Sequence, residues 1–197
     1  MHYIDTLILG ILQGLTEFLP ISSSGHLVLG QYFLNIYMPG NAFEVVLHIG
    51  TLMSVITVFR IEIKSIICDL SNSSNKFYLY ALVCGTIPAV IVGIVLKDMI
   101  SLIFDDIRFV SLSLIITGII LITSRFIIIR NLKLTMLVAF IIGLAQAGAI
   151  IPGISRSGMT ICMGLLMGLS APDAAKFSFL LSIPVIIGAA LLLSIIQ

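Results

Sequence analysis

The residues best suited to chemistry lie in two polar segments, GILQGLTEFLPISSSGHL at 10–27 and GLAQAGAIIPGISRSGMT at 143–160. In the first, Gln13 and Glu17 are four residues apart, so both project from one face of a helix toward the serine-rich turn. An ionisable carboxylate in an apolar segment is costly and is a functional candidate by default. The alternative for Glu17 is a protonated or serine-bonded carboxyl that only packs the segment.

The turn that follows offers the hydroxyls of Ser22, Ser23 and Ser24 just before a glycine. Such a turn suits contact with an oxyanion or nucleophilic attack, and its alternative is simple capping of the next helix. His26 comes directly after the turn. An imidazole beside a carboxylate can move protons near neutral pH, although a hydrogen-bonded structural histidine explains it as well.

In the second segment, Arg156 stands in a Gly/Ser turn after Gly153, with Ser155, Ser157 and Thr160 around it. A guanidinium, several hydroxyls and a helix N-terminus together form a cradle for phosphate. The alternative is an arginine that reaches toward the membrane surface. The apolar runs on both sides of the turn favour the phosphate site.

Three other ionisable residues carry a weaker signal. Glu44, His48 and Lys176 lie within or near the ends of apolar segments. For each of them an interfacial or packing role is at least as well supported as a functional one.

The composition assigns the chain to the integral membrane proteins. Of its 197 residues 59% are hydrophobic and 10% are charged, and the mean hydropathy is +1.24, more apolar surface than a soluble domain of this length hides. A formal net charge of +1 gives no strong positive electrostatic field that would attract nucleic acid, so no nucleic-acid partner is expected.

The apolar stretches predict an all-α, polytopic fold. Two of them, 4–35 and 134–169, are interrupted by proline and a Ser/Gly cluster. Since irregular backbone at membrane depth must be buried in protein, each is expected to form a re-entrant helical hairpin with its polar tip inside. Four others are about long enough to span the bilayer as single helices: 43–59, 77–96, 109–124 and 174–196.

The two polar segments are copies of one another. Aligned 133 residues apart they share six identities in eighteen positions, where roughly one or two arise by chance. Repeat unit one covers 4–124 and repeat unit two covers 134–197.

The loops predict how the two units are oriented. Basic loops at 60–76 and 125–133 are expected to be cytoplasmic, which places three crossings between the hairpins. The hairpins then enter from opposite faces as an inverted-topology repeat, with the tips at 20–26 and 152–160 meeting near the midplane.

Repeat unit two stops after one span, whereas unit one has three. We therefore expect a single membrane domain over 1–197 that lacks two helices of a full repeat. A truncated gene, a truncated chain and completion by homo-oligomerisation all account for this.

The expected site combines a carboxylate, a histidine, hydroxyls and an arginine, and lipids can reach it laterally. A lipid phosphate or diphosphate ester suits it. With Glu17 as a ligand, a hard divalent cation such as Mg²⁺ or Ca²⁺ is expected to neutralise a diphosphate.

At these residues the chain resembles the undecaprenyl-diphosphate phosphatases, also called bacitracin-resistance proteins. The resemblance covers nearly the whole chain. It implies hydrolysis of undecaprenyl diphosphate to the monophosphate, which recycles the lipid carrier for peptidoglycan, in the bacterial cell membrane with the site open toward the periplasm. The motifs that carry it are QGLTEFLPISSSGHL at 13–27, FEVVLHIGTL at 43–52, PGISRSGMT at 152–160 and KFSFLLSIP at 176–184.

The resemblance also implies roles for single residues. Arg156 would hold the diphosphate, Glu17 would bind metal or activate the nucleophile, and Ser23 has the position of the seryl nucleophile. His26 is an alternative nucleophile or proton donor, and a metal-activated water remains open. Gln13 replaces a glutamate that many members carry, which places more weight on Glu17. Expected contacts to the substrate come from Gln13, Ser22, Ser24, Gly153, Ser155, Ser157 and Thr160.

Two other functions remain open at this point. A transporter or flippase of a lipid-phosphate-like anion would share the inverted repeat and Arg156, but it has no need for Ser23 or for Glu17 together with His26. An inactive, truncated remnant would not express stably.

Overall fold

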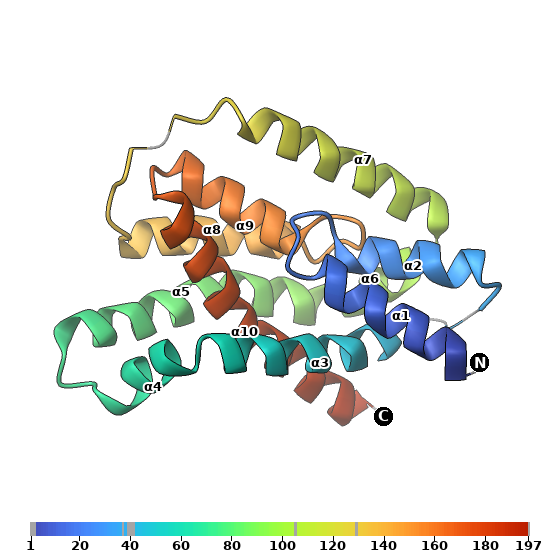
Figure 1. Ribbon diagram of the computed structural model, residues 1–197, viewed down its shortest axis with the longest axis horizontal. Helices are drawn as coiled ribbons and strands as arrows, with labels where there is room; N and C mark the ends of the chain where they lie inside the picture. Colours follow the sequence, from blue (N-terminus) through green and yellow to red (C-terminus); the bar gives the residue numbers. More distant parts are fainter. Residues whose placement is uncertain (1–2, 37, 39–41, 105, 129, 197) are drawn as a thin grey trace.

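The computed structural model describes residues 3–36, 38, 42–104, 106–128 and 130–196, and the regular structure in this part of the chain is helical. Figure 1 shows the arrangement of the helices along the long axis of the molecule. They are α1 (Tyr3–Thr16), α2 (Ser23–Phe33), α3 (Ala42–Val58), α4 (Arg60–Cys68), α5 (Ser73–Val95), α6 (Lys97–Phe104), α7 (Ile107–Ser124), α8 (Met136–Gly148), α9 (Arg156–Leu166) and α10 (Ala171–Ile196).

The helical lengths confirm a polytopic membrane fold. Within the described residues, α5, α7 and α10 are each long and apolar enough to cross a bilayer, and α3 with α4 qualifies as a fourth, bent span with an angle of 76°. The loop expected at 60–76 was wrong in part, because it contains the short helix α4. A second short helix, α6, lies between the spans expected at 77–96 and 109–124. In α4, charged side chains alternate with isoleucines, of which Ile66 is buried, so the segment can lie along the protein.

Two helical hairpins face each other. Helices α1 and α2 pack together around a break at 17–22, and α8 and α9 pack together around a break at 149–155. In Figure 1 the two breaks lie close together in the middle, and the hairpins extend from there in opposite directions. Entry from opposite membrane faces, and hence the inverted repeat, stays a prediction.

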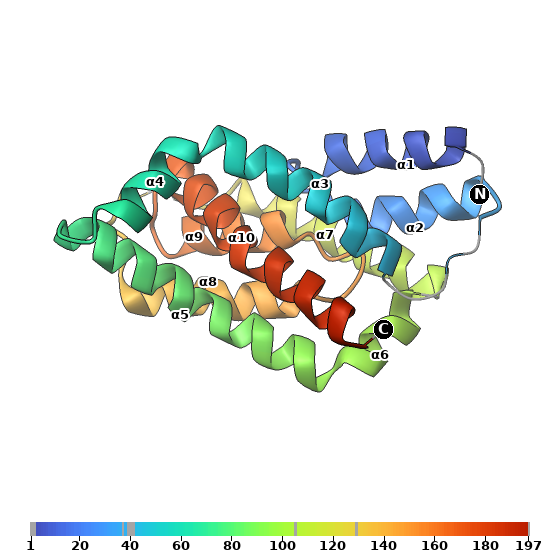
Figure 2. The same ribbon diagram turned by 90° about the horizontal axis from the view of Figure 1, so that it is seen from below.

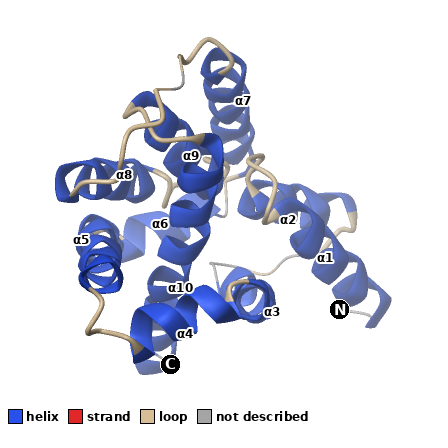
Figure 3. Ribbon diagram, turned by 60° about the vertical axis from the view of Figure 1, so that its left-hand side comes forward, coloured by secondary structure: helices blue, strands red, loops and turns tan. Residues whose placement is uncertain are grey.

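The second hairpin is fixed to the spans by a very close helix contact. A methyl group added at Gly143 of α8 would lie 2.3 Å from the carbonyl oxygen of Gly85 on α5. Small residues allow this approach, as is common between membrane helices. Figure 3 shows α5 and α8 side by side. Around this contact lies the core cluster, which consists of Ala81, Ala139, Ile142, Leu169, Ala174, Phe177 and Leu181.

Helix α10 passes through the centre of the molecule and contacts α3, α5 and α9. Figure 2 shows it running between α3 and α5. Its Phe179 ring lies 6.0 Å from the ring of Phe18, directly after Glu17, and 6.1 Å from that of Phe59. Helix α10 therefore supports the break of the first hairpin from the side.

Candidate active site

The breaks of the two hairpins are in direct contact. The Ser157 hydroxyl donates to the carbonyl of Leu19 over 3.2 Å. A methyl group added at Gly25 would lie 3.0 Å from the Cα of Gly153, so the glycines let the two backbones meet. The contact between the two tips that the sequence predicts is therefore confirmed.

Glu17 lies at the centre of this contact and is buried. Its Oε1 pairs with the guanidinium of Arg156. Its Oε2 accepts from the Ser23 hydroxyl at 2.5 Å and from the Gln13 amide at 3.1 Å, and lies 3.2 Å from Nε2 of His48. An ionised carboxylate has about four acceptor sites, and the four neighbouring donors engage both of its oxygens, three at Oε2 and one at Oε1. The alternative of a carboxyl bonded only to serine does not describe this environment.

Arg156 and Gln13 each retain a polar atom without a partner. Nη2 of Arg156 binds Glu17, whereas the buried Nη1 has no hydrogen-bond partner within the described part of the chain, and the same holds for Oε1 of Gln13. A buried donor or acceptor left unsatisfied costs about 1–3 kcal/mol. Nη1 can therefore donate to an anionic oxygen while Nη2 remains bound to Glu17.

The three serines of the first break have different partners. Ser22 has a φ of 70°, a rare conformation for a residue with a side chain, and its hydroxyl accepts from the backbone N–H of Gly25 at 3.3 Å. Its hydroxyl also lies 3.3 Å from that of Ser24. Ser22 therefore caps α2, while Ser23 points toward Glu17. The strain at Ser22 is of the kind that accumulates at functional sites.

The histidine next to the carboxylate is His48 and not His26. Nδ1 of His26 lies 2.7 Å from the carbonyl of Ser22, and within the described residues no ion pair joins this ring to Glu17. The expectation of His26 beside the carboxylate is thus wrong. A histidine follows the serine turn in sequence, but the first turn of α2 directs its ring back to the backbone four residues earlier.

Ser155 and Ser157 form the start of α9. Ser155 caps the helix by accepting from the N–H of Gly158 at 3.0 Å, and the two serine hydroxyls are 3.4 Å apart. Helix α2 begins at Ser23 and α9 at Arg156, so both N-termini lie where the breaks meet. The partial positive charges of the two N-termini favour a bound anion there.

Helix α7 holds the second break in shape. The Thr117 hydroxyl donates to the carbonyl of Gly153 at 2.8 Å and accepts from the N–H of Ser155 at 3.0 Å. Gly153 has a φ of +89°, and a methyl group there would lie 2.5 Å from the Val110 carbonyl. The position therefore requires glycine on both conformational and steric grounds.

Thr160 lies in the protein interior between α9 and α10. It is fully buried, its hydroxyl donates to the carbonyl of Arg156 at 2.8 Å, and it lies 2.6 Å from the hydroxyl of Ser178 on α10. These contacts tie α9 to α10, and its role in substrate binding stays a prediction.

Comparison with known proteins gives the family of this chain. Residues 6–197 match the family model of the bacitracin resistance protein BacA. The chain belongs to the BacA family. It is similar to the undecaprenyl-diphosphatase of Desulforapulum autotrophicum, with 40% identity over 98% of this chain and 77% of the relative. It also resembles the undecaprenyl-diphosphatase of Halothermothrix orenii, with 42% identity over 97% of this chain and 74% of the relative. With undecaprenyl-diphosphatase 2 of Bacillus thuringiensis it shares 43% identity over 97% of this chain and 75% of the relative.

The site of this BacA-family chain offers few protein ligands for the expected divalent cation. Within the described residues, no group of three His, Cys, Asp or Glu side chains is placed to hold a metal. Glu17 is a single carboxylate, and the unpartnered Oε1 of Gln13 adds one amide oxygen. Mg²⁺ and Ca²⁺ both take oxygen ligands, so substrate phosphates and water would have to complete the coordination of either ion, and binding of a divalent cation here stays a prediction.

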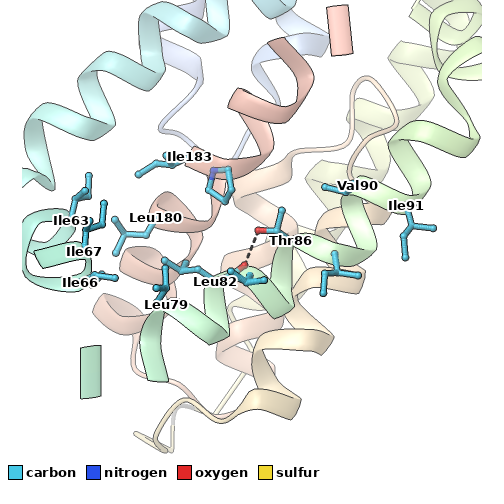
Figure 4. Close-up of a pocket in the computed structure, with 13 residues that line it drawn as sticks. Ile63, Ile66, Ile67, Leu79, Leu82, Thr86, Val90, Ile91, Leu180 and Ile183 are labelled. Atoms are coloured by element: carbon cyan, nitrogen blue, oxygen red, sulfur yellow. Dashed lines mark hydrogen bonds between the residues drawn. The ribbon is translucent and has the colours of Figure 1, made fainter. Parts of the chain in front are cut away.

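A separate apolar cavity of the BacA-family chain contains none of the expected site residues. It has a volume of about 380 Å³, and side chains of α4, α5 and α10 line it, among them Ile63, Leu82 and Leu180 (Figure 4). The hydroxyl of Thr86 points back to the Leu82 carbonyl at 2.7 Å. This surface suits hydrocarbon chains and offers no group for phosphate chemistry.

Two residues of the site were missed or undervalued from the sequence. For His48 an interfacial or packing role is at least as well supported by the sequence as a functional one, because the residue lies inside an apolar span. Thr117 carries no signal in the sequence, because a threonine in a helix often bonds to its own backbone. The motif FEVVLHIGTL held a signal for His48, since a buried ring nitrogen in an apolar span needs a partner.

Proposed function

We propose that this protein hydrolyses undecaprenyl diphosphate to undecaprenyl phosphate and inorganic phosphate where the two hairpin breaks meet. The observation that carries the proposal is the group of Glu17, Ser23 and Arg156, in which one carboxylate contacts both a hydroxyl and a guanidinium. Membership of the BacA family and the undecaprenyl-diphosphatase relatives support the same reaction.

A diphosphate suits the charges of the site. The free Nη1 of Arg156 and the N-termini of α2 and α9 provide donors for phosphate oxygens. Ser24, Ser155, Ser157 and the backbone at Gly153 lie around this position, in addition to Ser22. The polyprenyl chain would remain among the apolar helix faces and the surrounding lipid.

The contact between Ser23 and Glu17 supports a covalent route. The Ser23 oxygen forms a bond to the terminal phosphorus, the bond from that phosphorus to the bridging oxygen breaks, and undecaprenyl phosphate leaves with the electron pair. Glu17 takes the hydroxyl proton in this step. Water then attacks the phosphoserine and Glu17 returns a proton to the serine oxygen, so inorganic phosphate is released and Ser23 is regenerated.

A divalent cation would add charge stabilisation to this chemistry. Glu17 and the amide oxygen of Gln13 would hold Mg²⁺ together with phosphate oxygens, and the ion would neutralise part of the diphosphate charge. Arg156 supplies a fixed positive charge from the other side.

In the cell, we expect the protein in the bacterial cell membrane, with the site open toward the periplasm. The reaction returns the lipid carrier to peptidoglycan synthesis and thereby confers resistance to bacitracin. The chain spans about three quarters of the length of its curated relatives. Homo-oligomerisation stays a prediction.

A transporter or flippase is the less favoured alternative. Such a protein would need Arg156 and a cavity for the anion but would not need a serine hydroxyl 2.5 Å from a buried carboxylate. An inactive remnant would likewise have no use for this arrangement.

The test is phosphate release from undecaprenyl diphosphate by the purified chain in detergent, with and without Mg²⁺. Release proportional to protein concentration supports the phosphatase. No release from a folded, monodisperse sample, together with movement of the intact lipid across vesicles that contain the protein, would contradict it.

A further inference from the structure

His48 of α3 has a partner on each ring nitrogen. Nδ1 lies 2.6 Å from the carbonyl of Glu44, and Nε2 lies 3.2 Å from Oε2 of Glu17. A carbonyl and a carboxylate both accept, so Nδ1 and Nε2 must each carry a hydrogen, and the ring is an imidazolium that donates from both nitrogens. The orientation of the ring is thereby fixed, and Nε2 is directed at the carboxylate.

The start of α3 is itself anchored. Gln31 of α2 donates from its amide to the carboxylate of Glu44 at 2.7 Å, and both side chains are buried. This bond connects the second arm of the first hairpin to the first turn of α3. The backbone carbonyl that positions His48 is thus part of a rigid contact between two helices.

Substrate binding changes the balance of contacts at Glu17. Arg156 contacts Oε1 through Nη2, and an incoming phosphate would share this guanidinium because its Nη1 is unpartnered. Once the interaction of Arg156 with Oε1 weakens, the position of the carboxylate depends on the donors to Oε2. Of these, Ser23 is the proposed reactant, so it cannot also serve as a fixed support.

We propose that His48 is a positioning residue that holds the Glu17 carboxylate toward the Ser23 hydroxyl during the reaction. This inference rests on the phosphatase function proposed above. His48 acts through Glu17 and does not need to touch the phosphate. Gln13 contacts the same oxygen at 3.1 Å but comes from the preceding helical turn, so it supports the carboxylate from one side only.

Two substitutions separate positioning from packing. His48→Leu keeps an apolar side chain of similar size but removes the donor to Glu17. His48→Gln carries an amide N–H that can reach the same position, so the bond is restored without the ring. A packing role would be served about equally well by both.

The experiment measures kcat and KM for undecaprenyl diphosphate with the full chain in detergent, and thermal unfolding of each variant. We expect His48→Leu to lower kcat by about 10- to 100-fold with KM within about twofold of the wild type, and His48→Gln to recover most of kcat. Equal activity of His48→Leu and the wild type, an equal loss in both variants, or a loss confined to KM would each overturn the inference. Failure of the wild type to release phosphate would instead contradict the proposed function.

Discussion

Glu17 and Arg156 lie 139 residues apart in the sequence and form an ion pair between the breaks of two helical hairpins. Neither hairpin brings these charges together alone, because one contributes the carboxylate and the other the guanidinium. A charge placed in an apolar region without a partner is very costly, so each hairpin stabilises the polar tip of the other. Folding of the two units and formation of the site are therefore coupled.

The first prediction concerns the nucleophile. Ser23→Ala should lower phosphate release more than about 100-fold, because it removes the hydroxyl that faces Glu17. The wild type should also form an acid-stable phosphoserine when it is quenched during turnover with a substrate labelled at the terminal phosphate. Full activity of Ser23→Ala would favour direct attack by water.

The second prediction concerns the divalent cation. Gln13→Glu places a second carboxylate where the unpartnered amide oxygen lies. If Mg²⁺ binds between this position, Glu17 and the phosphates, the variant should reach half-maximal phosphate release at a lower Mg²⁺ concentration than the wild type. Chelation of divalent ions should abolish release by both proteins. An unchanged Mg²⁺ requirement in the variant would place the ion elsewhere.

The third prediction concerns the contact between α5 and α8. Gly143→Ala should destabilise the protein by about 1–3 kcal/mol, because the added methyl group would lie 2.3 Å from the Gly85 carbonyl. Gly148→Ala on the same helix is the matched control, since nothing lies within 4 Å of the added group. Thermal unfolding in detergent measures both. Equal midpoints for the two variants would show that the helices separate easily.

The fourth prediction concerns the support of the second break. Thr117→Val keeps the shape of the side chain but removes the hydroxyl that serves Gly153 and Ser155. It should cost about 1–3 kcal/mol in unfolding free energy because two buried backbone groups lose their partner. Thr117→Ser retains the hydroxyl and should stay close to the wild type. A stable valine variant would mean that water replaces the threonine.

Much of the fold follows from sequence because lipid restricts it so strongly. Apolar segments of sufficient length must become helices, and α5, α7 and α10 lie within a few residues of the predicted spans. The break motifs also predicted that the tips that carry Glu17 and Arg156 lie close together, but not that these two side chains form an ion pair.

The remaining parts of the site depend on contacts that no local pattern contains. His48 lies beside Glu17 because of how α3 packs against the first hairpin. Sequence spacing instead favours His26, which is closer to Glu17 in the chain. Thr117 likewise acts on a segment 36 residues away. The helices α4 and α6 were missed because short amphipathic helices and polar loops have similar compositions.

The catalytic role of Glu17 is tested most directly by comparing two glutamate variants in the same assay. Glu17→Gln removes the charge that contacts Arg156 and the acceptor that would take the Ser23 proton, whereas Glu62→Gln removes a partly exposed carboxylate 3.6 Å from Lys176. We expect phosphate release from undecaprenyl diphosphate to fall at least about 100-fold in Glu17→Gln and to stay within about twofold of the wild type in Glu62→Gln. Undiminished release by a folded Glu17→Gln variant would contradict this catalytic role.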